Sequence, residues 1–124
     1  GAGSQWNNTE GLQVGKSGDG TLNVTDGGVV SNTKGYIGRG FRSTSQATIV
    51  GANSTWSNSK GLYIGGNSSG TGGTGILNIV DSGLVTVGKT TKLWSDGTIN
   101  LDGGTLDVGE LRLVPSFPRS PTRP

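Results

Sequence analysis

Short clusters of Val, Ile and Leu alternate with polar residues along most of the chain. In 21–24, for example, Leu22 and Val24 would face one side and Asn23 the other. This period-two alternation predicts β-strands with one buried face. The clearest candidates are 21–24, 47–50, 76–80 and 98–101, with weaker ones at 29–31, 54–56 and 84–86. Glycine-rich turns such as 26–28, 81–83 and 102–104 separate them, because Asp-Gly and Gly-Gly accept the positive φ of tight turns.

The sequence also repeats itself. Residues 1–8 recur as 51–58 and residues 11–15 recur as 61–65, an offset of 50 residues. A shorter motif, apolar-x-apolar-Gly, ends at glycines 15, 38, 65, 88 and 109, which are spaced by 23, 27, 23 and 21 residues. A repeat of about 20–50 residues is typical of solenoids.

We therefore predict an all-β chain folded as a parallel β-helix (β-solenoid) of about 4–5 coils, each of roughly 21–27 residues, over residues 1–111. A meander of β-hairpins is the alternative, since Asp-Gly also favours hairpins, but equivalent strands that recur in one direction favour a parallel stack. The expected core ladder consists of Leu12, Val14, Leu22, Val24, Ile37, Ile49, Leu62, Ile64, Leu77, Ile79, Val87, Ile99, Leu101 and Val108.

The composition agrees with a thin core. Of 124 residues, 29% are hydrophobic and 15% charged, while Gly, Thr, Ser and Asn make up about half of the chain. Such a chain is either disordered or folded around a narrow apolar column, and its low charge argues against disorder. The net charge is +2, but residues 112–124 carry three arginines and no acid. Residues 1–111 hold seven bases and eight acids, so we expect no basic face for nucleic acid.

Catalytic chemistry has few candidates. The chain has no His and no Cys, which excludes a His-based triad, a Cys nucleophile and the commonest zinc ligands. Its Asp residues lie mostly in glycine turns, where calcium binding or a pair of glycosidase-type carboxylates is conceivable. Capping of backbone N–H groups is the favoured role. We expect no enzyme activity, no cofactor and no metal, with a polysaccharide-cleaving β-helix as the least favoured reading.

Aromatic side chains offer a possible ligand surface. Trp6 and Trp56 are related by the 50-residue repeat and should lie on one face two coils apart. Together with Tyr36 and Tyr63 they could form a platform on which sugars stack. Packing at the corners of the solenoid is the competing interpretation.

The last segment, 112–124, differs from the rest and is expected to be an extended, polyproline II-like tail. Its prolines recur at every third position, which places them on one ridge of that helix. A disordered linker is the alternative. Docking on a neighbouring copy is the preferred hypothesis, and the residues proposed for this self-assembly are Leu111, Leu113, Val114, Pro115, Phe117, Pro118, Pro121 and Pro124.

Residues 1–8, 11–15, 20–32 and 35–38, with a second copy from 51 onward, resemble the Gly-rich repeat of autotransporter (type V secretion) passengers, which also occurs in some PEP-CTERM proteins. The resemblance covers about residues 1–110, and the longer Gly/Ser/Thr segment at 67–75 departs from it. It implies a right-handed β-helix, exported to the extracellular space or outer surface of a bacterium.

These observations lead us to expect a non-enzymatic structural repeat protein. It would form a cell-surface stalk or a self-assembling filament by head-to-tail stacking of solenoids, so that its main partner is itself. An adhesin-type module that binds surface glycans through its aromatic face is the alternative function. Surface polysaccharide is thus a further candidate partner, whereas nucleic acid binding and membrane insertion are not expected. No run approaches the roughly 20 apolar residues of a membrane span.

Overall fold

A computed structural model describes residues 1–114 of the chain, and this part is all-β. It contains no helix that is long and apolar enough to cross a membrane. The strands are β1 Gln5–Asn7, β2 Leu12–Val14, β3 Thr21–Thr25, β4 Val29–Asn32, β5 Gly35–Ile37, β6 Thr44–Val50, β7 Thr55–Asn58, β8 Leu62–Ile64, β9 Thr74–Val80, β10 Leu84–Trp94, β11 Gly97–Asp102 and β12 Thr105–Val114.

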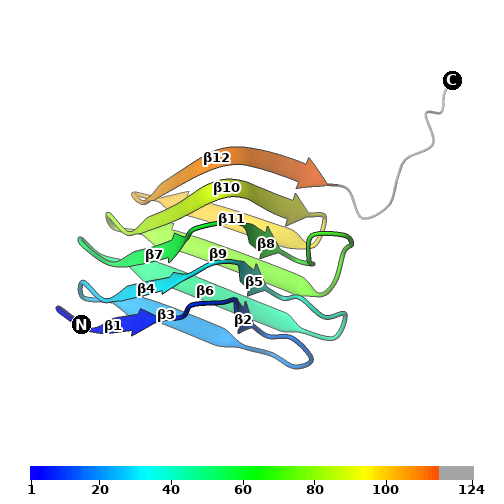
Figure 1. Cartoon of the computed structure of the whole chain (residues 1–124), viewed down its shortest axis with the longest axis horizontal. Helices are drawn as coiled ribbons and strands as arrows, with labels where there is room; N and C mark the ends of the chain where they lie inside the picture. The colour runs from blue at the N-terminus through cyan, green and yellow to red at the C-terminus, as the bar shows by residue number, and fades with distance from the viewer. Residues whose placement is uncertain (115–124) are drawn as a thin grey trace, which may run out of the picture.

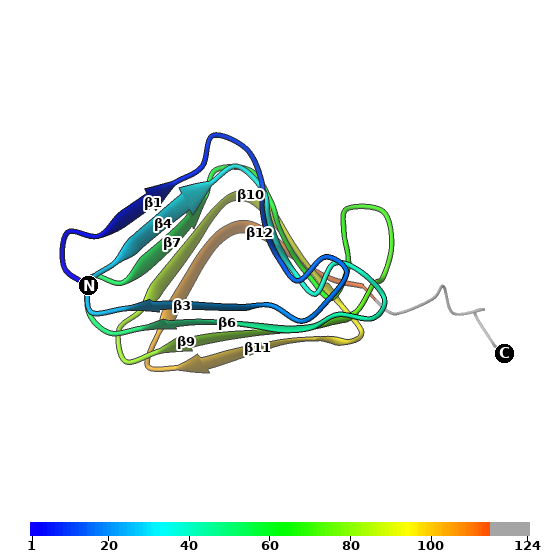
Figure 2. The ribbon, with the colours of Figure 1, turned by 90° about the horizontal axis from the view of Figure 1, so that it is seen from below.

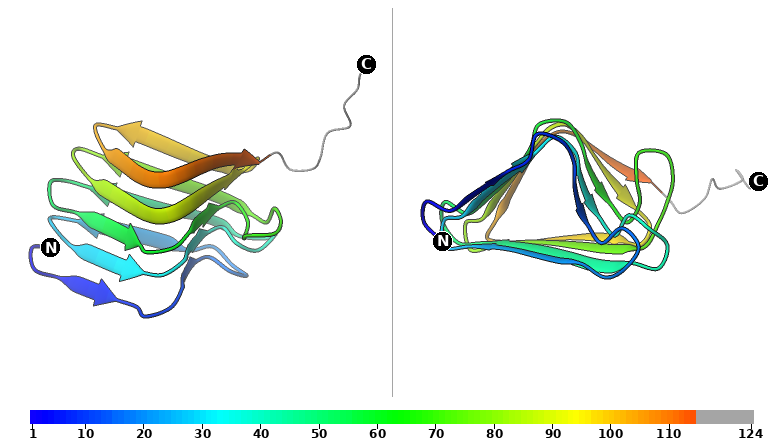
Figure 3. Two further views of the ribbon diagram at one scale, coloured as in Figure 1. Left: turned by 45° about the horizontal axis from the view of Figure 1, so that its top comes forward. Right: turned by 60° about the horizontal axis from the view of Figure 1, so that its bottom comes forward.

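The chain winds through four coils and begins a fifth (Figure 1), and each coil is roughly triangular in cross-section (Figure 3, right). Three strands form each of the first three coils, whereas β10 bends to supply two sides of the fourth coil and β12 two sides of the fifth. Seen from the N-terminal end, the chain runs clockwise as it recedes, so the solenoid is right-handed (Figure 2). Every pairing between named strands is parallel, which confirms the predicted β-helix and excludes the hairpin meander.

The three sides of the triangle are named here after their first strands. The β1 face contains β1, β4, β7 and the first parts of β10 and β12. The β2 face contains β2, β5, β8 and the second parts of β10 and β12. The β3 face is a separate four-stranded sheet in the order β11-β9-β6-β3.

Side chains alternate in and out on each face, so inward residues form columns that run from coil to coil. On the β3 face, Val24, Ile49, Ile79 and Leu101 are in register with one another. On the β1 face, Trp6 aligns with Val30 and then with Trp56, which agrees with the 50-residue repeat. Every second side chain of a strand enters the core, so buried and more exposed residues alternate along it.

The structure places most of the expected core ladder inside this column. Buried members are Val14, Leu22, Val24, Ile37, Ile49, Leu62, Ile64, Leu77, Ile79 and Val87. Partly buried members that pack against them are Leu12, Ile99 and Val108. The expectation was wrong for Leu101, whose side chain is 55% exposed. Leu101 continues the inward column of Ile79, but it lies in the last strand of the β3 face and no strand of residues 1–114 covers it.

The five recurring glycines are not structurally equivalent. Gly15, Gly38 and Gly65 follow the β2-face strands and adopt positive φ at the corner leading to the β3 face. Gly88 and Gly109 instead lie within β10 and β12, at the corner between the β1 and β2 faces. The motif recurs on two faces because both have an apolar-polar-apolar strand followed by a bend.

The boundary between the solenoid and the tail also differs from the prediction. β12 continues to Val114, so residues 112–114 pair with β10 instead of beginning an extended tail at 112. The proline ridge at 115–124, including Pro115, Phe117, Pro118, Pro121 and Pro124, lies outside the described residues.

Candidate functional site

Among residues 1–114, the N-terminal coil has no strand beneath it. β1, β2 and β3 each pair with one neighbour only, so their outer edges present free N–H and C=O groups. The interior opens here as a hollow of about 490 Å³, whose apolar lining includes Trp6, Leu22, Val24 and Val30. The Trp6 side chain points along the inward column but is 50% exposed, because the column ends with it.

The C-terminal end is open in the same way. β11 and β12 each have one free edge within residues 1–114, and the inward columns end in apolar side chains. Leu101 is 55% exposed, Leu111 48% and Leu113 71%. The described residues have five exposed large hydrophobic side chains, and four of them end inward columns at the two open ends; Phe41, on a lateral loop, is the fifth.

Trp56 was a candidate for an exposed aromatic platform, with packing at the corners of the solenoid as the competing interpretation, and the structure shows it packed inside. Its side chain is fully buried, and its indole N–H donates to Asn32 Oδ1 at 2.6 Å. Space for the ring exists because position 35 is glycine: a Cβ there would lie 2.9 Å from Trp56 Cζ2. Trp6, the equivalent residue two coils below, is exposed only because it lies at the open end, so the two tryptophans form no common surface.

Tyr36 and Tyr63 lie on the outer side of the β2 face, but their ring faces are occupied. The two rings stack on each other with centroids 5.2 Å apart and an interplanar angle of 28°. The Arg39 guanidinium covers Tyr36 at 4.7 Å from its ring centroid, and Tyr63 is buried. Sugar stacking needs an open ring face, so these tyrosines do not form the platform that the sequence allowed. Their packing on one another follows from their register in β5 and β8.

The carboxylates are spread over separate corners of the triangle. Asp26, Asp81 and Asp102 lie where the β3 face turns into the β1 face, and the first two have positive φ. Asp19 Oδ1 accepts a hydrogen bond from the Thr44 N–H at 2.8 Å, which is a turn-capping role. Residues 1–114 contain no group of three or more His, Cys, Asp or Glu side chains placed to hold a metal ion.

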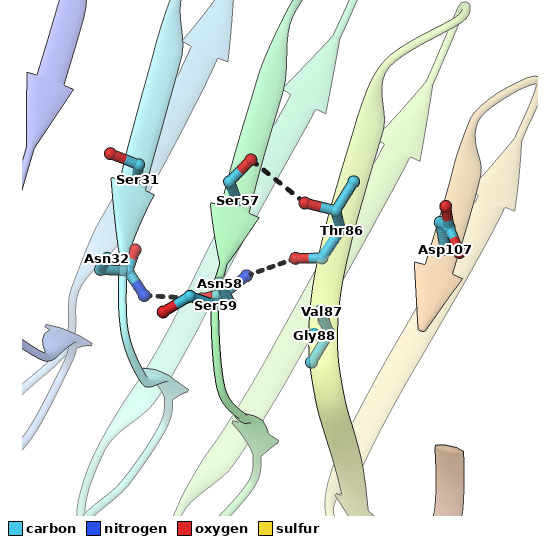
Figure 4. A pocket seen from close by; sticks show the side chains of 9 residues that line it. All are labelled: Ser31, Asn32, Ser57, Asn58, Ser59, Thr86, Val87, Gly88 and Asp107. Atoms are coloured by element: carbon cyan, nitrogen blue, oxygen red, sulfur yellow. Dashed lines mark hydrogen bonds between the residues drawn. The ribbon is translucent and has the colours of Figure 1, made fainter. Parts of the chain in front are cut away.

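A polar hollow of about 350 Å³ lies along the β1 face, where it is lined by Ser31, Asn32, Ser57, Asn58, Thr86 and Asp107 among others (Figure 4). Most of its polar groups bond to the next coil. Asn32 Nδ2 donates to Asn58 Oδ1 at 2.7 Å, Asn58 Nδ2 donates to the Thr86 carbonyl at 3.3 Å, and the Thr86 hydroxyl bonds to Ser57 at 3.1 Å. These side chains are used to join coils, and Asp107 is the one carboxylate of the hollow.

Cationic side chains are concentrated on one side. Residues 1–114 contain eight Lys and Arg and eight Asp and Glu, yet all eight bases lie on the β2 face or at its two corners. The net charge, from which we expected no basic face for nucleic acid, does not reveal this clustering, and four of the eight acids (Glu10, Asp19, Asp96 and Glu110) lie on the same face or at its corners. The sequence did not reveal the column Lys34, Lys60 and Lys89, because coils of unequal length place these residues 26 and 29 positions apart.

Comparison with protein-family models, with curated proteins and with solved structures found no match for this chain. The functional argument consequently rests on the surfaces described above.

Proposed function

We propose that this protein is a non-enzymatic structural subunit that stacks end to end into an extracellular stalk or filament. The observation that carries this proposal is the character of the two ends: four of the five exposed large hydrophobic side chains in residues 1–114 end inward columns there. Monomeric proteins bury such apolar groups or use them in contacts, and free strand edges invite pairing with another chain.

The two ends match each other in register on the β1 and β2 faces. A copy placed above β12 would continue the ladders of the β1 and β2 faces, so that its Trp6 follows Leu106 and its Val14 follows Leu113. On these faces the copy would lie one strand spacing away, about 4.8 Å. The β3 face has one strand fewer than the other two faces, so β3 of this copy would lie two strand spacings from β11, and one strand position between them is not filled by residues 1–114. Backbone groups and apolar columns of the β1 and β2 faces are satisfied at both ends in this arrangement. The contact is heterologous and repeats by translation along the solenoid axis, so it generates an open filament.

Further support comes from what the lateral surfaces offer. The carboxylates of residues 1–114 are spread over all three corners and form no group of three that could hold a metal ion. The polar side chains of the β1-face hollow bond to one another. Both observations favour a non-catalytic role. The resemblance to autotransporter passenger repeats supports a location on or outside a bacterial surface. The alternative function, glycan binding through an aromatic face, lacks its platform because Trp56 is buried and the tyrosine rings cover each other.

Sedimentation velocity over a range of protein concentrations, combined with negative-stain microscopy, tests the proposal. We expect concentration-dependent growth into filaments. Leu113→Lys should abolish this growth, because the lysine would have to be desolvated against Val14 of the next copy. Phe41→Lys is the matched control, since Phe41 is 79% exposed and Leu113 71%, but only Leu113 lies at an end. A stable monomer at high concentration, or equal loss of assembly in both variants, would overturn the proposal.

A further inference from the structure

Three lysines from successive coils line one hollow on the side of the solenoid. Lys34, Lys60 and Lys89 are all exposed and lie at the corner where the β1 face turns into the β2 face. The Lys60 N–H donates to the Thr33 carbonyl and the Lys89 N–H to the Lys60 carbonyl, which places the three residues one above another. The hollow that they share has a volume of about 340 Å³.

This hollow, called the lysine groove below, is also lined by Gly61, Tyr63 and Thr90. Gly61 forms part of the lining next to Lys60, and a Cβ there would lie 2.6 Å from the Tyr63 hydroxyl oxygen. The phenol of Tyr63 therefore lies across Gly61 and brings a hydrogen-bonding hydroxyl into the groove. Thr90, which also lines the hollow, adds a second hydroxyl group.

Stacked like charges carry an energetic cost. Lysines directly opposite one another on neighbouring strands repel, and here three follow at the coil spacing of about 4.8 Å. Among residues 1–114, no carboxylate lies between these three lysines in the column. Glu10 in the first coil and Glu110 in the fifth lie at its two ends. An anion seated in the groove would relieve this repulsion, so the groove is electrostatically complementary to a negatively charged ligand.

We propose that the lysine groove binds a linear acidic polysaccharide, whose chain runs along the solenoid axis. One cation per coil gives a line of positive charges on the same scale as the spacing of carboxylate or sulfate groups along a chain of acidic sugar rings. The flanking hydroxyl group of Tyr63 suits sugar hydroxyls, while the Thr90 hydroxyl donates to Glu110 Oε1 at 3.5 Å and could still accept a hydrogen bond. Binding uses the side of a single subunit and does not depend on assembly.

The same observations favour a polysaccharide over nucleic acid. Double-stranded DNA carries one charge per about 1.7 Å of its axis, far denser than one lysine per coil. Single strands are held mainly by stacking of bases on open aromatic faces, and the faces of Tyr36 and Tyr63 are already occupied by each other and by Arg39. With eight bases balanced by eight acids in residues 1–114, the described part also lacks the overall positive field that attracts nucleic acid.

Titration calorimetry with polygalacturonate oligomers tests the proposal, with Leu113→Lys as the parent protein so that assembly does not contribute. We expect saturable binding that weakens at least tenfold in Lys34→Gln/Lys60→Gln. The matched control, Lys16→Gln/Arg42→Gln, removes two exposed cations outside the groove and should change the affinity less than twofold. Raising the salt from about 50 to 200 mM should weaken binding in the parent more than in the groove variant.

Each other outcome contradicts the proposal. An equal loss in the two double variants would show nonspecific charge attraction, and binding of neutral dextran with similar affinity would show that charge is not the determinant. Tighter binding of oligo(dT) or duplex DNA than of polygalacturonate would assign the groove to nucleic acid instead. Absence of polygalacturonate binding in the parent would remove the proposal, while leaving the filament proposal intact.

Discussion

The chain of buried hydrogen bonds inside the β1 face gives a sharp test of how the coils are stacked. Trp56 donates to Asn32, Asn32 donates to Asn58, and Asn58 donates to the Thr86 carbonyl. Both asparagines are buried. In the next two coils the same inward column holds Val87 and Val108, so the site accepts valine by shape. Asn32→Val and Asn58→Val, alone and together, therefore change hydrogen bonding with little change in volume.

The expected free energies follow from which groups lose a partner. In Asn58→Val the Asn32 Nδ2 group is left buried without its acceptor, which should cost about 1–3 kcal/mol. In the Asn32→Val background that group is already absent, and Asn58→Val instead removes a stranded Oδ1. There the second substitution should be neutral or stabilising by about 1 kcal/mol. The Trp56 N–H loses its acceptor both in Asn32→Val and in the double variant, so its cost cancels when these two proteins are compared. The coupling free energy is then about 2 kcal/mol.

Urea unfolding followed by far-UV circular dichroism measures these values. It should be done with the Leu113→Lys protein at low concentration, so that association does not add to stability. Equal m-values in the four proteins would support a two-state comparison. If Asn58→Val costs the same in both backgrounds, the two side chains do not contact each other, and the register between β4 and β7 would be wrong.

Two further substitutions test local packing. Gly38→Ala should destabilise the fold by about 2–4 kcal/mol, because Gly38 has φ +71° and a Cβ there would lie 2.3 Å from the Thr74 carbonyl oxygen. The control Gly18→Ala, with nothing within 4 Å of its Cβ, should change the stability by less than about 0.5 kcal/mol. The midpoints of urea unfolding measure both effects. Thr91→Val should stabilise the protein by about 1 kcal/mol, because Thr91 Oγ1 is buried and has no hydrogen-bond partner among residues 1–114. A thermal melt measures this, and an unchanged or lowered melting temperature would contradict the prediction.

The fold could be predicted from local patterns. Alternation in stretches such as 21–24 and 98–101 fixed which side chains face inward, and the repeat fixed the parallel direction of the strands. The 50-residue offset correctly aligned Trp6 with Trp56. Alignment by the shorter glycine motif failed after Gly65, because Gly88 ends a β1-face segment, whereas Gly65 ends a β2-face strand. Two faces with the same local pattern cannot be distinguished without the register between strands.

The candidate sites were harder to predict, because they depend on burial and on which residues stack. Trp56 and Trp6 are equivalent in sequence, but only Trp56 has a coil on both sides and Gly35 beside its ring. Likewise, Leu101 has an inward-facing pattern and becomes exposed only because β11 ends the β3 face in residues 1–114. The lysine groove depends on coils of different lengths, so neither net charge nor a fixed period could reveal it.

The central claim is that copies stack with β12 against the β1 and β2 strands of the next copy. The outward column Asn7, Ser31, Ser57, Thr86 and Asp107 predicts that Asn7 of one copy lies directly over Asp107 of another.

At a strand spacing of about 4.8 Å, cysteines at these two positions are within the Cα separation that a disulfide allows. The chain has no native cysteine to interfere. Oxidised Asn7→Cys/Asp107→Cys should therefore give a ladder of covalent oligomers on a non-reducing denaturing gel. The control Asn7→Cys/Asn100→Cys places the second thiol on the β3 face and should run as a single band of uncrosslinked chain. A ladder of equal strength from the control pair, or none from the matched pair, would contradict the stacking.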